Sequence, residues 1–223
     1  MVIGVQEHTA SRGTIGILGA GRVGTAIARL AVAAGYRVKI ATSKPAAENA
    51  LIIEIVTPGA EAVDAAEAAG SDLVVVAVPL HKYKSVNAEA LAGRVVVDAM
   101  NYWSVTDGDI ADFEVDDRSS SEVVAAHLSA SRVVKSFNHI GYHEMEPDAA
   151  ALGAADRRAL AVAANDAAAK AQVAAFIDAL GFDAVDAGDL ASGKAFEPGT
   201  DVFNGRFNAD ELSEKLHASL IAA

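Results

Sequence analysis

The sequence predicts an α/β protein with a doubly wound, mostly parallel sheet, helices on both faces of the sheet and a short helical C-terminal tail. Three observations support this fold class. Short apolar runs alternate with helix-like segments from Thr14 to Asn101, the order in which crossover helices join parallel strands. Two of these runs, 73–78 and 95–101, are rich in valine, as strands covered on both faces usually are. A glycine-rich turn also separates the first run from the first helix.

Residues 14–43 read as a strand, a glycine turn, a helix and a second strand. The turn fits G-x-G-x-x-G: Gly19 permits a tight bend, Gly21 lets a pyrophosphate approach the backbone, and Gly24 lets the helix pack close to the strand. Because the first N–H groups of a helix attract anions, we predict a dinucleotide site here. Its residues are Gly19, Ala20, Gly21, Arg22, Val23 and Gly24, where Arg22 is either a phosphate contact or a surface charge.

The end of the second strand indicates which dinucleotide binds. A cofactor without a 2′-phosphate is usually held there by an Asp or Glu that bonds the ribose hydroxyls. This chain has Thr42, Ser43 and Lys44 instead, with no acid. Two hydroxyls and an ammonium attract a phosphate, whereas a carboxylate repels it. We therefore predict NADP(H); the alternative is an ordinary polar turn with a solvated Lys44.

The rest of the N-terminal half continues the alternation. Asp98 is expected to anchor a loop rather than to perform chemistry. Residues 102–117 form a long acidic loop, expected to be solvated rather than to bind a cation. The pattern predicts helices at 45–56, 64–69 and 81–91, and strands at 60–63, 73–78 and 95–101.

The C-terminal half adds further elements to the same domain. Ser119 begins a helix with a capping-box pattern that runs to Leu128, and Asn208 caps a terminal helix at 208–221. Residues 147–156 read as a loop or a loose helix. Strands are predicted at 132–138, 160–164 and 183–186, and a helix at 166–180. We expect one domain over 1–223, with a core at 14–187 and a dependent segment at 188–223.

The composition excludes several functions. The 223 residues carry a net charge of −12, which disfavours binding to nucleic acid. The chain has no cysteine, so disulfides, thiolate metal sites and cysteine catalysis are excluded. The histidine spacing indicates no metal site. Residues 1–12 do not resemble a secretory signal, and no run is long and apolar enough to span a membrane, so we expect a soluble, cytoplasmic protein.

Several segments together resemble one known family. They are Thr-Ser-Lys at 42–44, LVVVAVPLHKY at 73–83, VVVDAMNYW at 95–103, VVKSFNHIG at 133–141 and DAGDLA at 186–191. With the glycine turn, they resemble the coenzyme F420-dependent NADP oxidoreductase family, also described as NADPH-dependent F420 reductases, from Thr14 to Asp189. The resemblance implies an extended Rossmann fold that binds NADP(H) and passes a hydride between NADP(H) and the deazaflavin F420.

The resemblance also implies roles for individual residues. Ala20 to Val23 would hold the pyrophosphate, and Ser43 and Lys44 the 2′-phosphate. The nicotinamide would lie beside the end of the strand at 73–78 and its neighbour, and the second ring system beside the segment after 137. The residues implied are Ala77, Val78, Pro79, Leu80, Ala99 and Met100 for the first group, and Asn138, His139 and Ile140 for the second.

A direct hydride transfer needs stacked rings and excluded water more than it needs a catalytic acid. His139 is the candidate catalytic residue, to stabilise charge on the deazaflavin or to orient a carbonyl; the alternative is a hydrogen-bonded structural histidine. Two other functions stay open: an NADPH reductase with a flavin, quinone or carbonyl acceptor, and a non-catalytic NADP(H)-binding or sensing protein. A small-molecule redox partner and a homodimer are expected. The aromatic tail, with Phe196, Phe203 and Phe207, would cover the pocket or contact a second subunit.

Overall fold

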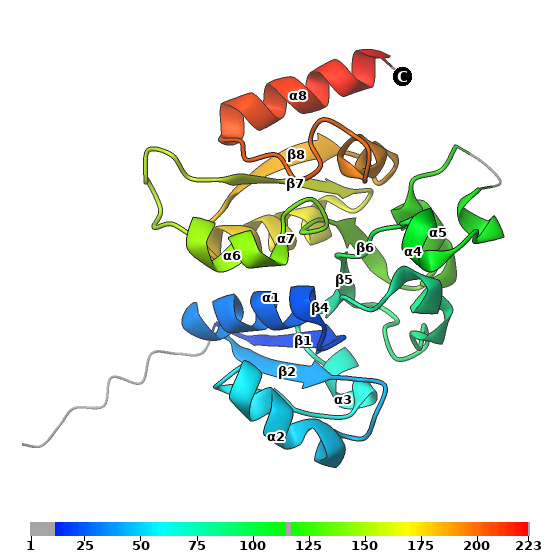
Figure 1. The fold of residues 1–223 in the computed structure, drawn as a ribbon, viewed down its shortest axis with the longest axis vertical. Helices are drawn as coiled ribbons and strands as arrows, with labels where there is room; N and C mark the ends of the chain where they lie inside the picture. The colour runs from blue at the N-terminus through cyan, green and yellow to red at the C-terminus, as the bar shows by residue number, and fades with distance from the viewer. Residues whose placement is uncertain (1–11, 115–116, 223) are drawn as a thin grey trace, which may run out of the picture.

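A computed structural model describes residues 12–114 and 117–222, which build one eight-stranded sheet (Figure 1). The strand order is β3-β2-β1-β4-β5-β6-β7-β8. Every neighbouring pair is parallel except β6 and β7, which are antiparallel. The predicted α/β fold class is therefore confirmed. The strands are β1 Thr14–Leu18, β2 Arg37–Ala41, β3 Ala60–Ala62, β4 Leu73–Val76, β5 Val95–Asp98, β6 Arg132–Lys135, β7 Ala159–Ala164 and β8 Asp183–Gly188.

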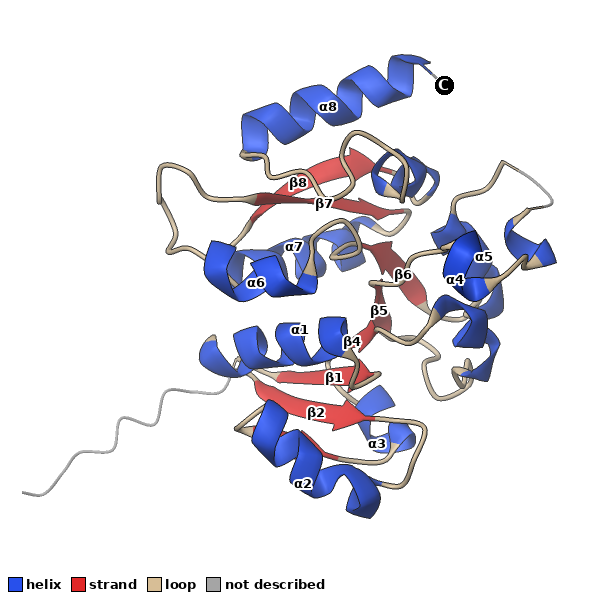
Figure 2. Ribbon diagram, viewed as in Figure 1, coloured by secondary structure: helices blue, strands red, loops and turns tan. Residues whose placement is uncertain are grey.

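Helices cover both faces of the sheet (Figure 2). Successive strand residues point to opposite faces, so Val75 and Val97 join one apolar cluster while Val74 and Val96 join another. The first face packs against α1 Arg22–Ala33, α2 Ala46–Val56, α6 Tyr142–Asp148 and α7 Ala167–Ala179. The second packs against α3 Ala65–Ala69, the 3-10 helix η1 Leu80–Ser85, α5 Ser120–His127, the 3-10 helix η3 Ala191–Phe196 and α8 Ala209–Ala222.

The strand order reverses direction at β1, which pairs with β2 on one side and with β4 on the other. Leu18, the last residue of β1, lies opposite Ala41 and Val76. The backbone continues this pairing past the strand ends, because Gly19 N donates to Ala41 O at 2.9 Å and Ala77 N donates to Leu18 O at 2.9 Å. Ligands of open α/β sheets bind at such a switch point.

Two predictions of secondary structure are wrong in this part of the chain. The helix expected at 81–91 is only η1, followed by turns. Asn87 Oδ1 accepts the N–H groups of Glu89 and Ala90, at 3.0 and 3.1 Å, and thereby replaces helical hydrogen bonds with a local turn. The segment at 102–117, expected to be a loop, contains two short helices, α4 Ser104–Asp107 and η2 Ala111–Phe113.

The helix α6 stands between the strand predicted at 132–138 and the loop or loose helix predicted at 147–156, and its first turns were not predicted to be helical. The backbone N–H of Gly141 donates to Glu144 Oε2 at 3.0 Å, and Met145 is buried in the core. A glutamate three residues after a helix start is the signal that could have located it. The capping of α5 is confirmed, since Ser119 Oγ accepts Glu122 N at 3.2 Å and Glu122 Oε2 accepts Ser119 N at 2.8 Å.

The C-terminal segment packs onto β7 and β8. Asn208 caps α8 as predicted, since Asn208 Oδ1 accepts Glu211 N at 3.0 Å. Phe196 is fully buried with Leu212 and Leu216 of α8, and the ring of Phe203 contacts Trp103 with centroids 5.3 Å apart. The tail thus packs against β7 and β8, and Phe203 contacts the acidic segment, as we call the predicted acidic loop at 102–117. Across residues 12–114 and 117–222, none of the helices combines the length and apolarity needed to cross a bilayer.

Candidate dinucleotide-binding site

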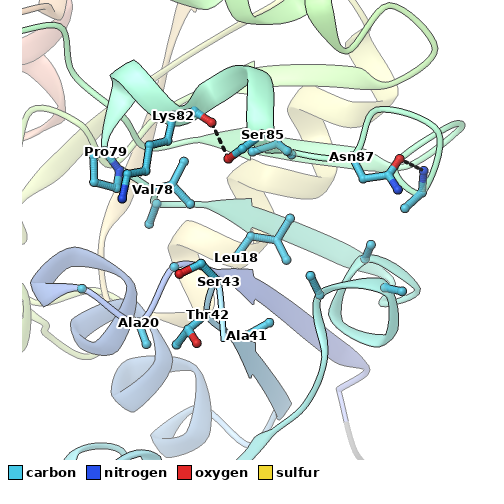
Figure 3. Close-up of a pocket in the computed structure, with 18 residues that line it drawn as sticks. Leu18, Ala20, Ala41, Thr42, Ser43, Val78, Pro79, Lys82, Ser85 and Asn87 are labelled. Carbon is cyan, nitrogen blue, oxygen red and sulfur yellow. Dashed lines mark hydrogen bonds between the residues drawn. The ribbon is translucent and has the colours of Figure 1, made fainter. Parts of the chain in front are cut away.

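A cavity of about 710 Å³ opens at the carboxyl ends of β1, β2 and β4, at the switch point of the sheet (Figure 3). Its walls come from the glycine turn, the end of β2, α3, the segment after β4, and η1 with the turn that follows it. Eight residues predicted to bind the cofactor line this cavity: Gly19, Ala20, Gly21, Thr42, Ser43, Ala77, Val78 and Pro79.

Two of the three glycines in the turn lie too close to neighbouring backbone for a side chain, and the third faces open space. Gly19 has φ +114°, and a Cβ there would collide with the carbonyl oxygen of Ala77. A Cβ on Gly24 would overlap the carbonyl oxygen of Gly19. Gly21 differs, because a Cβ there would have no protein atom within 4 Å. The open backbone position therefore lies where a pyrophosphate has to approach.

The start of α1 supplies hydrogen-bond donors to this position. Gly21 is the N-cap residue and has no side chain to bond the first N–H groups of the helix. These groups have no partners within the helix, and the helix dipole makes its N-terminus attractive to an anion. The turn therefore fits a pyrophosphate both sterically and electrostatically.

Thr42, Ser43 and Lys44 lie at the β2 end of the cavity. Thr42 Oγ1 accepts the backbone N–H of Lys44 at 3.0 Å and the side-chain amide of Asn49 at 2.8 Å, which fixes the turn. Ser43 lines the cavity, but Lys44 does not. The ammonium of Lys44 lies 4.0 Å from Glu48 Oε2 on an exposed surface.

Three polar lining residues were not predicted from the sequence, namely Lys82, Ser85 and Asn87. They lie on η1 and the turn after it, where the sequence was read as a continuous helix. Among the described residues that line the cavity, no Asp or Glu occurs and Lys82 is the single charged side chain. The cavity therefore suits an anionic ligand.

The remaining predicted residues do not line the cavity. Val23 packs against the core, Gly24 is buried, and Arg22 donates to the hydroxyl of Tyr142 on α6 at 2.9 Å. Leu80, Ala99, Met100, Asn138 and Ile140 are buried. The amide of Asn138 donates to Asn101 Oδ1 at 3.1 Å and to Phe196 O at 2.9 Å, so it joins β5, β6 and the C-terminal tail.

Comparison with known proteins assigns the family. The family model described as NADP oxidoreductase, coenzyme F420-dependent, matches residues 14–102. A crystal structure of a protein from Arthrobacter sp. FB24, described as a candidate F420-dependent NADP-reductase, is similar at 30% identity with a TM-score of 0.69, over 81% of this chain and 87% of that chain. The chain belongs to the coenzyme F420-dependent NADP oxidoreductase family.

Other solved structures are similar as well. A hypothetical protein from Sinorhizobium meliloti has 29% identity and a TM-score of 0.77, over 87% of this chain and 95% of that chain. A 3-hydroxyisobutyrate dehydrogenase from Mycobacterium tuberculosis is similar at 17% identity with a TM-score of 0.57, over 82% of this chain and 57% of that chain. This similarity shows the fold alone. Among curated proteins, none matches this sequence. Membership of the F420-dependent NADP oxidoreductase family supports an NADP(H)-dependent oxidoreductase.

His139, the candidate catalytic residue, is buried in the core. Its side chain is 2% exposed, its Nε2 accepts the backbone N–H of Ala161 at 3.0 Å, and its ring packs against Phe196. Burial, with further contributions from Arg158 and Lys135, lowers its pKa from 6.5 to about 3. A neutral imidazole whose acceptor nitrogen is already bonded within the core fits the alternative raised from the sequence, a hydrogen-bonded structural histidine.

The buried His139 makes the protein sensitive to acid. Its pKa is lower in the folded state than in the unfolded chain, so stability is full above the unfolded value of 6.5 and falls as pH drops toward about 3. This one group contributes a slope of roughly 1.4 kcal/mol per pH unit within that window. Urea unfolding of the wild type and of His139→Gln, between neutral and mildly acid pH, measures it. His127→Gln serves as the control variant. Equal pH slopes of stability for the wild type and His139→Gln would contradict the structural role of His139.

The acidic segment is partly neutralised by η1 rather than fully solvated. Asp107 Oδ1 lies 3.0 Å from His81 Nδ1, and Asp112 accepts the hydroxyl of Tyr83 at 2.9 Å while pairing with Lys84 at 2.5 Å. The hydrogen bonds from Lys84 and Tyr83 lower the pKa of the Asp112 carboxyl. No cluster of potential metal ligands occurs in the part of the chain that the structure describes.

A buried ion pair supports the backbone where β5 ends. Asp98 and Lys135 have no exposed side-chain surface, and Lys135 Nζ lies 3.5 Å from Asp98 Oδ2. Lys135 Nζ donates to Met100 O at 2.6 Å, and Asp98 Oδ1 accepts Met100 N at 2.9 Å. Asp98 thus anchors a loop, as the sequence predicted, while the role of Lys135 was not foreseen.

Proposed function

We propose that this protein transfers a hydride between the nicotinamide of NADP(H) and a second ring system, for which coenzyme F420 is the first candidate. The observation that carries the proposal is a cavity at the glycine turn that has an open backbone position, two hydroxyl side chains at the end of β2 and no carboxylate among its described lining residues. This donor set accepts a phosphorylated adenosine and disfavours a cofactor that needs an acidic ribose partner. Family membership supports the oxidoreductase chemistry.

Each part of the cavity has a defined task in this proposal. The N–H groups at the start of α1 bind the pyrophosphate, and Thr42 and Ser43 donate hydrogen bonds to the 2′-phosphate. Ala77, Val78 and Pro79 form an apolar wall that leads from the adenosine side toward the end of β5 and excludes water. When bound, NADPH supplies a hydride to the acceptor ring, and one proton from solvent completes the reduction of the acceptor. No protein acid is required for the hydride itself, which agrees with a neutral, buried His139.

A second candidate is an NADPH reductase with a flavin, quinone or carbonyl acceptor. The burial of His139 and Ile140 favours it over F420, because neither side chain is available for the contacts with the deazaflavin ring that the family resemblance implies. The expected homodimer belongs to the proposal as well, and sedimentation measures it independently of turnover.

Mixing the protein with NADPH and F420 tests the first candidate. We expect loss of the deazaflavin absorbance with NADPH and a rate at least about tenfold lower with NADH, since one lost phosphate contact of about 1.4 kcal/mol is a factor of ten. Oxidation of NADPH by a flavin, quinone or carbonyl compound, with no change in F420, would favour the second candidate. Tight NADPH binding with no turnover of any acceptor would indicate a non-catalytic sensor.

A further inference from the structure

Four consecutive residues of η1, His81 to Lys84, direct their side chains toward two different parts of the molecule, the acidic segment and the cavity. Three of them contact the acidic segment: His81 pairs with Asp107, while Tyr83 and Lys84 both bond Asp112. Lys82 is the fourth, and it lines the cavity instead. The acidic segment therefore neutralises the flanking cation Lys84 but leaves Lys82 directed toward the ligand site.

The backbone of Lys82 is held in place by hydrogen bonds, whereas its ammonium has no ion-pair partner among the residues that the structure describes. Lys82 N donates to Pro79 O at 2.8 Å, and Lys82 O accepts the hydroxyl of Ser85 at 2.7 Å. Among the described residues, no carboxylate or carbonyl accepts a hydrogen bond from its ammonium. In Figure 3 the side chain extends toward Pro79, on the side of the cavity that faces Ala20 and Ser43.

The ammonium of Lys82 matters for binding an anionic cofactor because of the charges around it. The whole chain has a net charge of −12, so its overall field repels an anionic cofactor. A local cation in a carboxylate-free cavity offsets that repulsion where the ligand binds. Lys44, the cation predicted from the sequence, is poorly placed for this task because its side chain is 67% exposed, faces Glu48 and lies outside the cavity lining.

We propose that Lys82 binds a phosphate group of the cofactor and is the main side-chain cation for NADP(H) affinity, ahead of Lys44. The inference rests on the proposed function, because it takes NADP(H) as the ligand of this cavity. Two phosphates share the chemistry that Lys82 recognises, the 2′-phosphate and the pyrophosphate. They differ in one measurable respect, since NADH carries the pyrophosphate only.

Equilibrium binding of NADPH and NADH to Lys82→Ala tests the proposal, with Lys84→Ala as the matched control. Both variants remove one lysine from the same 3-10 helix, but only Lys82 lines the cavity. We expect Lys82→Ala to weaken NADPH binding at least about tenfold, the effect of losing one charge-assisted contact, and Lys84→Ala to weaken it less than about twofold. The effect of Lys82→Ala should diminish at high salt, because ions screen an open cavity.

These binding measurements distinguish the 2′-phosphate from the pyrophosphate as the group that Lys82 binds. They also distinguish failure of the Lys82 proposal from failure of the proposed function. Weakening of NADPH alone assigns Lys82 to the 2′-phosphate, and equal weakening of NADPH and NADH assigns it to the pyrophosphate. NADPH binding to Lys82→Ala that stays within twofold of the wild type would overturn the Lys82 proposal, as would an equal loss in Lys84→Ala. A wild-type protein that binds no NADPH would overturn the proposed function itself. Lys82→Arg, which keeps the charge, should retain most of the affinity, and the unliganded melting temperatures report whether each variant is folded.

Discussion

Replacing Gly21 by valine is expected to abolish NADP(H) binding and to leave the fold intact. Gly21 has φ −76° and ψ −174°, a conformation that any L-residue adopts, and a Cβ there meets no protein atom within 4 Å. The Cβ that the substitution adds therefore meets no clash within the unliganded protein. The new side chain occupies the space through which the pyrophosphate reaches the backbone, so we expect at least about a hundredfold weaker binding, or about 2.8 kcal/mol.

The matched control for Gly21→Val is Gly24→Val in the same turn. A Cβ on Gly24 overlaps the carbonyl oxygen of Gly19, so this variant has to separate α1 from the turn and should lose stability as well as cofactor binding. Calorimetric titration with NADPH and thermal melting of the unliganded variants measure both properties. A Gly21→Val protein that binds NADPH like the wild type would place the cofactor elsewhere. Equal melting losses in the two variants would contradict the described geometry of the turn.

Replacing Lys135 by methionine is expected to destabilise the protein by about 3–5 kcal/mol, because it leaves the carboxylate of Asp98 buried without its cation. Both side chains of the pair have 0% exposure, so water cannot take the place of the ammonium. Lys135 also supplies the hydrogen bond to Met100 O, and its loss leaves that carbonyl without this donor. Urea unfolding should therefore give a much lower midpoint with an unchanged slope.

The control for this substitution is Lys39→Met on β2. Lys39 also stands on a strand and pairs with a carboxylate, Glu67 at 2.6 Å, but both side chains are partly exposed. An exposed pair of this kind contributes roughly 0–1 kcal/mol. A second variant, in which Asp98 and Lys135 are both replaced by apolar residues of similar size, should recover part of the loss. Equal effects of Lys135→Met and Lys39→Met would contradict the role assigned to the buried pair.

The sequence allowed the prediction of those features that depend on local pattern. The glycine turn, the strands on either side of it and the caps at Ser119 and Asn208 each follow from a few neighbouring residues, and the structure has them where they were expected. The direction of β7, antiparallel to β6, follows instead from a connection through α6 that was not recognised.

The sequence was least informative about residues whose environment is set by distant segments. His139 is buried because Phe196 from the C-terminal tail packs against its ring and β7 donates to its Nε2, more than twenty positions away in each case. Lys82 faces the cavity because its neighbours bond an acidic segment that begins some twenty residues later. Hydrophobic periodicity was also insufficient after η1, where the side chain of Asn87 competes with a continuing helix for backbone donors.

Thermal melting of the wild-type protein with and without NADPH, together with calorimetric titration, tests the central claim most directly, namely that the cavity at the switch point holds NADP(H). At a cofactor concentration of about a hundred times Kd, binding adds roughly 2.7 kcal/mol and should raise the melting temperature by about 5–10 °C, with a smaller rise for NADH at the same concentration. No heat of binding and no rise in melting temperature with saturating NADPH would contradict the claim.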